Sequence, residues 1–244
     1  MLKPLNKTGN FKQVFGFLFN FAVDFPYNMK KEDISPELYQ KILECFMTAL
    51  MKNGLKATTM DSVAANLQMS KRTLYEIFGN KEDLFLEATI FFHKKMRERL
   101  SIIFSQSQNV MEAIIQCFLY NRDVMSKLNP EFIRDIEEYA NKQHLLPDSH
   151  NQRIHQNFYE ILQKGVTEGY FRQDVNLKVQ CRMLALQMEA LKRTEELFPS
   201  DISLLEVYDN VIIGFLRAIS SEKGLKELDH LLPSVSSLSH NLEN

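Results

Sequence analysis

Apolar residues recur every three or four positions along most of this chain, which is the spacing of an α-helix that buries one face. The repeat is clearest in the segments 38–50, 154–162 and 204–219. No segment keeps the two-residue alternation of a half-buried β-strand. Proline is absent between Pro36 and Pro130, so long helices can form without interruption. The pattern therefore predicts an all-α protein.

The first predicted helix lies between residues 35 and 54. Ser35 is a typical N-cap, and Pro36 occupies the first helical position, where the missing N–H costs nothing. Asn53 and Gly54 form a pair that is common in hairpin turns, but the residues on both sides have helical spacing. We therefore interpret Gly54 as the C-cap of this helix.

The second and fourth helices are predicted from their caps. The second begins at Thr58 or Thr59, and Thr58 with Asp61 has the spacing of a capping box. The fourth is capped by Asn80 and Asp83 and extends beyond residue 100.

The third helix begins after Ser70 and ends at Gly79. Leu74 and Phe78 are four residues apart, so they share the face that is turned to the core. Two helices of about eight residues joined by a short turn form the outline of a helix-turn-helix, whose second helix enters the DNA major groove.

Charge along the chain is distributed unevenly. The net charge is -2, with 45% apolar and 25% charged residues, so any affinity for nucleic acid must come from a local patch. Between residues 52 and 81 the basic residues are Lys52, Lys56, Lys71, Arg72 and Lys81, and the acidic ones are Asp61 and Glu76. On spacing and charge alone, DNA binding and an ordinary solvated helix face are equally good interpretations.

Other chemistry is not indicated by the sequence. It contains no phosphate-binding loop, nucleophile motif or metal-ligand spacing, which predicts a protein that is not an enzyme and needs no cofactor or metal. Three histidines, His144, His150 and His155, are spaced six and five apart and do not share one helix face. The cysteines Cys45, Cys117 and Cys181 form no CxxC pair, which favours a reducing, cytoplasmic location.

The segment "ATTMDSVAANLQMSKRTLYEIFGNKEDLFLEAT", residues 57–89, resembles the N-terminal DNA-binding domain of the TetR family of transcriptional regulators. Its most specific part is "SKRTLYEIFGNKEDL". The resemblance covers roughly residues 36–100, and "EGYFRQDVN", residues 168–176, is similar to the turn before the last two long helices in many members. It implies a three-helix DNA-binding domain followed by a larger helical domain that binds a small apolar or amphipathic effector and dimerises.

The resemblance also implies roles for individual residues. Thr59, Tyr75 and Lys81 would contact phosphates, whereas Lys71, Arg72 and Thr73 would face base edges or the adjacent backbone. Lysine and arginine can donate to guanine, whereas a tyrosine hydroxyl mainly fixes the register of the protein on the duplex. Ser70, at the start of the helix, completes the predicted DNA-binding set.

Three further residues of this segment bear on DNA binding. Gln68 stands in the turn where the family often has glycine, so it either adopts unusual dihedral angles or the turn differs in geometry. Ile77 stands where an aromatic residue or histidine often adds a phosphate contact, which predicts one contact fewer. Glu76 can accept from a cytosine amine or point into solvent, and solvent is our expectation.

The larger domain offers a dimer interface and an effector site. The resemblance implies that helices at about 176–193 and 203–221 pair with their copies in a homodimer, and Gly214 and Ala218 permit close helix approach. Ordinary intrachain core is the alternative for any single residue there. Aromatic and methionine side chains suited to an apolar pocket are more often core, and we name no ligand residues. They are Phe104, Met111, Phe118, Tyr120, Met125, Phe132, Tyr139, Phe158, Tyr159 and Met183.

The expected organisation is an extension at 1–34, a helix-turn-helix domain at 35–82, an effector and dimerisation domain at 83–232 and a frayed tail at 233–244. The extension is interpreted as an accessory helix or as the result of an upstream start, since Met29 opens a sensible N-terminus. An arm that binds a membrane surface or a partner is the alternative. The apolar run of the extension is too short and too polar to span a membrane. The predicted function is a ligand-responsive repressor that binds a palindromic operator. An all-helical protein that uses the helix-turn-helix only for packing is the alternative.

Overall fold

The computed structural model describes residues 34–129, 132, 135, 148–191 and 197–232 of the 244-residue chain. Contacts divide the chain into two compact units. One, the head unit, comprises Ala22–Arg97 and Lys127–His150, and the other, the bundle unit, comprises Met1–Phe21, Glu98–Ser126 and Asn151–Asn244. Within the described residues every element is a helix apart from one isolated β-bridge, which confirms the predicted all-α fold.

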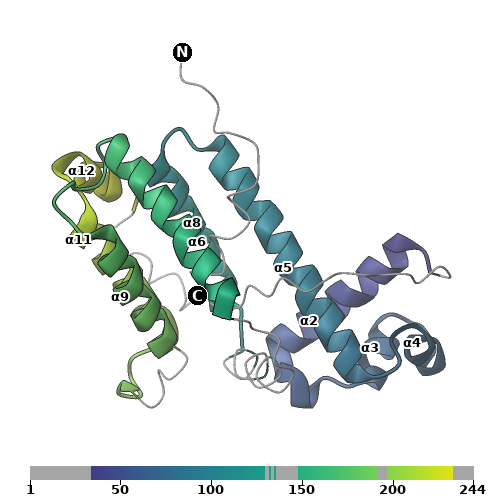
Figure 1. The fold of residues 1–244 in the computed structure, drawn as a ribbon. Coiled ribbons are helices and arrows are strands. Elements are labelled where there is room, and N and C mark those ends of the chain that lie inside the picture. The colour runs from purple at the N-terminus through teal and green to yellow at the C-terminus, as the bar shows by residue number, and fades with distance from the viewer. Residues whose placement is uncertain (1–33, 130–131, 133–134, 136–147, 192–196, 233–244) are drawn as a thin grey trace. The chain divides into compact units, whose positions relative to one another are not determined.

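The first described helix of the head unit is α2, Pro36–Ala57 (Figure 1). The Ser35 side chain accepts a hydrogen bond from the Leu38 N–H at 3.2 Å, so the predicted N-cap is confirmed. Gly54 has φ 76 and ψ 169, a conformation that glycine adopts without a steric penalty, and it interrupts the helical geometry. The regular helix therefore ends where the sequence predicts, and one further turn follows the break.

Helix α3, Met60–Asn66, starts one residue later than the predicted capping box requires. The Thr59 hydroxyl accepts from the Ser62 N–H at 3.1 Å, and the Ser62 hydroxyl accepts from the Thr59 N–H at 3.2 Å. Thr58 is instead buried and donates to the Gly54 carbonyl at 2.8 Å. The predicted pairing of Thr58 with Asp61 is therefore wrong, because tertiary packing takes Thr58 into the core.

Helix α4, Lys71–Phe78, and the long helix α5, Lys81–Gln106, follow without a loop between them. Gly79, with φ 75, ends α4. Asn80 accepts from the Asp83 N–H at 2.8 Å, as predicted for the start of α5. The core of this unit is built from the inward faces of these helices, and Tyr39 stacks on Phe78 with 5.3 Å between ring centroids. Its largest buried members include Ile42, Leu43, Phe46, Leu50, Leu74, Leu84 and Phe85.

The bundle unit contains the end of α5 and further helices. They are α6 (Val110–Ser126), α8 (Asp148–Thr167), α9 (Leu177–Ala190), α11 (Leu204–Ile219) and α12 (Glu222–Leu231). Helix α11 packs against both α9 and α6, and α12 packs against α6. The predicted helices near 176–193 and 203–221 correspond to α9 and α11, whereas α12 was not predicted as a separate helix.

The turn before α9 is hydrogen-bonded to the junction between α11 and α12. Phe171 and Ser220 form the isolated antiparallel bridge, in which the Arg172 N–H donates to the Ile219 carbonyl at 2.9 Å. The Phe171 ring lies against Gly165 of α8, where an added Cβ would come within 2.2 Å of it. Small residues therefore allow this turn to pack closely.

Polar groups are also buried inside the bundle unit. The Arg122 Nε donates to both carboxylate oxygens of Asp209, at 2.9 and 2.8 Å. Tyr208 is fully buried and stacks on Phe118. Burial raises the pKa of the Tyr208 hydroxyl, with the nearby Asp209 carboxylate acting in the same direction. These groups form a neutral polar layer between α6 and α11.

Several predictions concern residues outside the described part of the chain. They are the extension at 1–34 apart from its last residue, the tail at 233–244, Tyr139 and His144; the side chains of His150 and His155 also lie outside it. Among the described helices, none combines the length and the apolar character that crossing a lipid bilayer requires.

Candidate nucleic-acid interface

The turn between α3 and α4 is held by a non-glycine residue in a left-handed conformation. Gln68 has φ 55, and the Met69 N–H donates to the Ala64 carbonyl at 3.0 Å. Such a conformation costs a side-chain-bearing residue on the order of 1 kcal/mol. The first of the two options for Gln68, unusual dihedral angles, is therefore confirmed. The turn keeps its geometry without glycine.

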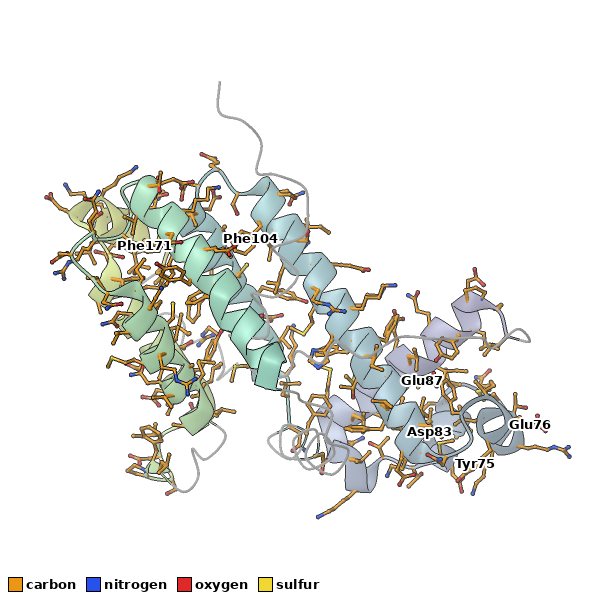
Figure 2. All side chains as sticks on the ribbon, in the orientation of Figure 1. Tyr75, Glu76, Asp83, Glu87, Phe104 and Phe171 are labelled. Carbon is orange, nitrogen blue, oxygen red and sulfur yellow. The ribbon has the colours of Figure 1, made fainter. Side chains whose placement is uncertain are left out.

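Helix α4 divides cleanly into an anchored face and an exposed face. Leu74 is completely buried and Phe78 is nearly so. Lys71, Arg72 and Glu76 are exposed, as is Tyr75, whose side chain is seen with that of Glu76 at the outer edge of this unit (Figure 2). Buried apolar anchors thus hold a polar, mostly charged surface in a fixed orientation.

The first turn of α4 is closed by its own hydroxyl groups. The Ser70 Oγ accepts from the Thr73 N–H at 3.0 Å and lies 2.8 Å from the Thr73 Oγ1. The Leu74 N–H donates to the Ser70 carbonyl at 3.2 Å. The N–H groups of Lys71 and Arg72 have no carbonyl of a preceding helical turn, and the helix dipole makes this end favourable for an anion. The sequence reasoning that placed Ser70 as a cap is confirmed.

Both basic residues of α4 are paired with carboxylates. The Lys71 Nζ lies 2.6 Å from the Asp61 Oδ1 of α3, and the Arg72 Nε lies 2.8 Å from the Glu76 Oε1. The hydrogen bond to Asp61 raises the pKa of Lys71, so this side chain is charged at neutral pH. Exposed ion pairs of this kind contribute little to stability and exchange readily for another anion. Glu76 points toward solvent, as expected, and also holds Arg72.

Lys81 has a different environment from the two basic residues of α4. Its Nζ donates to the Leu55 backbone carbonyl, and the side chain is partly buried. Burial lowers the pKa of Lys81, while the carboxylates of Glu82 and Asp135 act in the opposite direction. The hydrogen bond to the Leu55 carbonyl holds the Lys81 ammonium in one position beside the N-terminus of α5.

The predicted DNA-binding residues all belong to the head unit. Thr59 and Ser70 cap α3 and α4, and the hydroxyl hydrogen of Thr59 remains suited to donation toward a phosphate. The others lie on α4 or at the first position of α5. Within the described residues no group of histidine, cysteine and acidic side chains could hold a metal ion.

Comparison with known proteins agrees with this geometry. Residues 42–88 match the family described as "Bacterial regulatory proteins, tetR family". The HTH-type transcriptional regulator YhgD of Bacillus subtilis is 41% identical over 58 residues, which are 24% of this chain and 30% of YhgD. The HTH-type transcriptional repressor KstR2 of Mycolicibacterium smegmatis is 24% identical over 149 residues, which are 59% of this chain and 72% of KstR2. The chain thus contains a TetR-type DNA-binding segment at residues 42–88.

Solved structures extend the similarity beyond the matched segment. The ketosteroid transcriptional regulator KstR2 of Mycobacterium tuberculosis has a TM-score of 0.52 at 18% identity, covering 78% of this chain and 98% of that one. A TetR transcription regulator from Haloarcula marismortui has a TM-score of 0.58 at 14% identity, covering 77% and 100%. These neighbours show the TetR-type fold, in which a helix-turn-helix domain precedes a larger helical domain. The relatives and structural neighbours named above are described as transcriptional regulators. This agrees with the prediction that the chain is not an enzyme.

Some residues of this candidate interface were not found from the sequence. The pairings of Asp61 and Glu76 needed side-chain positions, although the four-residue spacing of Arg72 and Glu76 was a usable signal. Asp135, whose Oδ2 accepts from the Leu55 N–H at 2.7 Å, is eighty residues from its partner, and no local pattern could have indicated it.

Proposed function

We propose that this protein is a homodimeric TetR-type repressor that binds a palindromic operator through α4 of each copy and is released by a small-molecule effector. The observation that carries this proposal is the exposed, positively charged first turn of α4 on the buried Leu74 and Phe78 anchors. A helix fixed in this way can enter the major groove without ordering a flexible segment first. The predicted cytoplasmic location fits such a role, and we expect no cofactor.

The DNA contacts fall into two groups. Thr59, Tyr75 and Lys81 bind phosphates and set the register of the head unit on the duplex. Lys71, Arg72 and Thr73 face base edges, where the Arg72 guanidinium can donate two hydrogen bonds to a guanine. The pairing with Glu76 uses the Arg72 Nε, so the two terminal nitrogens are the donors that a guanine edge would take. Base contacts then determine which operator is preferred.

Dimerisation is supported by an apolar stripe on α9. Val179, Met183 and Leu186 are exposed by 50%, 50% and 60%, and their spacing places them on one face of the helix. On α11, an added Cβ at Gly214 would meet nothing within 4 Å, and Ala218 is exposed one turn later. A second copy that covers these faces would remove apolar side chains from water.

The effector site is supported by a cavity in the bundle unit. Its volume is about 10 Å³, which is room for about one water molecule. The lining side chains are all apolar: Phe104, Ile114, Cys117, Phe118, Phe158, Leu184, Ile212, Phe215 and Leu216. Such a lining favours an apolar effector. An effector larger than the cavity can enter only if the helices that line it move apart. Of the aromatic and methionine residues singled out in the sequence, Phe104, Phe118 and Phe158 line it.

Fluorescence anisotropy with the DNA that flanks the protein's own coding region tests the proposal. We expect sequence-selective binding that weakens at least about tenfold between low and moderate salt, because phosphate contacts release counterions. The double variant Lys71→Ala, Arg72→Ala is the matched control and should lose selectivity. The absence of salt-dependent binding to any of this DNA would favour the alternative of a helical interaction protein.

A thermal-shift screen against a metabolite library tests the effector. A compound that binds the cavity should raise the melting temperature, because it binds the folded state only. The same compound should displace the protein from its operator in the anisotropy assay. Stabilisation without displacement would contradict the proposed release mechanism.

A further inference from the structure

A carboxylate, a backbone peptide and an ammonium group form one continuous chain of hydrogen bonds in the head unit. The Asp135 Oδ2 accepts from the Leu55 N–H at 2.7 Å, and the Leu55 carbonyl accepts from the Lys81 Nζ. We call this the Asp135–Leu55–Lys81 relay. It joins residues that are far apart in the sequence and ends at a side chain predicted to contact DNA.

The break in α2 at Gly54 creates the need for Asp135. Because Gly54 leaves the helical conformation, the Leu55 N–H has no helical partner in the preceding turn. A partly buried N–H without an acceptor destabilises the fold, because it has lost its hydrogen bond to water. Asp135, only 9% exposed, supplies that acceptor. A carboxylate so buried in turn requires donors and positive charge nearby, which the Leu55 peptide and Lys81 provide.

The other end of the relay fixes Lys81. A lysine ammonium on a flexible stem has many rotamers, and holding one of them for a phosphate costs entropy. Here the Leu55 carbonyl takes one of the three N–H donors, and the remaining donors suit a phosphate oxygen. The side chain is thus oriented before DNA arrives, whereas Lys71 and Arg72 must exchange their carboxylate partners.

We propose that Asp135 is a positioning residue for DNA binding. It acts through the Leu55 peptide and holds the Lys81 ammonium where it can contact a phosphate. The inference rests on the proposed function and adds a residue from outside the helix-turn-helix segment. It assigns Asp135 an effect opposite to that expected from its charge. An acidic group near a polyanion ordinarily weakens binding, whereas this one strengthens it.

The sign of the Asp135→Asn effect is the first test. Asparagine keeps the shape of the side chain and an acceptor oxygen but removes the negative charge that strengthens both hydrogen bonds. We expect operator affinity to fall about threefold to tenfold, equally for all operator variants, and the salt slope to fall by up to about 1. Asp201→Asn, an exposed position in the bundle unit with the same charge change, is the control and should bind unchanged or slightly tighter.

A double-mutant cycle with Lys81→Ala separates positioning from general destabilisation. If Asp135 acts through Lys81, Asp135→Asn should add little to the loss already caused by Lys81→Ala. A merely structural role would lower affinity by the same factor in both backgrounds. Urea unfolding of each variant establishes that the proteins compared are folded.

Amide hydrogen exchange at Leu55 gives a readout that needs no DNA. Asp135→Asn should speed exchange at this amide about tenfold relative to Asp201→Asn, because the carboxylate is its acceptor. Equal behaviour of the two variants in affinity and exchange would overturn the inference. Failure of the unmodified protein to bind any DNA would instead overturn the proposed function, so the two failures are distinguishable.

Discussion

Helices α4 and α9 each present a row of exposed side chains, but the rows have opposite chemistry. On α4 the row is Lys71, Arg72, Tyr75 and Glu76, and its charged members already have ion-pair partners. On α9 the row is apolar and consists of Val179, Met183 and Leu186, which are at least half exposed in the single described copy. The first row can exchange its partners for phosphates, whereas the second gains only when another apolar face covers it.

Substitutions in the interior of the bundle unit should affect stability more than substitutions in either exposed row. Gly224→Ala should give the largest effect, because the added Cβ would lie 2.0 Å from the Tyr170 carbonyl oxygen, a backbone atom that cannot turn away. We expect the free energy of unfolding to fall by about 2 to 4 kcal/mol in urea denaturation.

Gly214→Ala is the matched control for that substitution. With open space around it, an added methyl group in a helix should stabilise the isolated copy by about 0.5 to 1 kcal/mol. A loss of stability similar to that of Gly224→Ala would show that α11 is covered at this position.

Met183→Glu tests the apolar row on α9. A charge at the centre of the apolar stripe would be buried by a second copy, so self-association should weaken at least about thirtyfold in sedimentation equilibrium. Gln173→Glu adds the same charge at an exposed position in the turn before α9 and should leave association unchanged. Equal association of the two variants would show that the dimer uses another surface.

Arg72→Ala addresses the row on α4. If Arg72 reads a guanine, its loss should cost about 1 to 3 kcal/mol at one operator position and relax discrimination there. Competition titrations with single-base operator variants measure this directly. Uniform loss across all variants would assign Arg72 to the phosphate backbone, the role expected of Lys81.

Asp61→Asn should have the smallest effect on operator affinity, and it should raise the affinity where Arg72→Ala lowers it. Removing the carboxylate that pairs with Lys71 frees the ammonium for DNA and deletes a negative charge, so affinity should rise about twofold to threefold. The rise should disappear when Lys71 is alanine. Weaker binding would mean that Asp61 orients Lys71 for its contact.

The local parts of this interface were predictable from the sequence. Ser70, Gly79 and the Leu74–Phe78 spacing determine where α4 begins, ends and anchors, and each of these signals lies within a few residues of the feature it predicts. The left-handed conformation of Gln68 could be predicted as one of two options because the similar family often has glycine at this turn position.

Features that depend on distant contacts were not predictable. The choice of Thr59 over Thr58 as a cap depends on burial of Thr58, and both residues fit the local pattern. Helix α12 was missed as a separate element, although Ser221 caps it with a hydrogen bond from the Gly224 N–H at 3.1 Å. The partner of the Leu55 N–H could not be inferred from any spacing in the chain.

The bridge between Phe171 and Ser220 has a consequence for how the bundle unit opens. With the Ser221 N–H also donating to the Tyr170 carbonyl at 2.9 Å, the chain from the turn to the junction forms a loop closed by two backbone hydrogen bonds. Helices α9 and α11 both lie inside that loop. If these hydrogen bonds break, α9 and α11 lose the same constraint. Their backbone amides therefore gain or lose protection from solvent exchange together, as one cooperative unit.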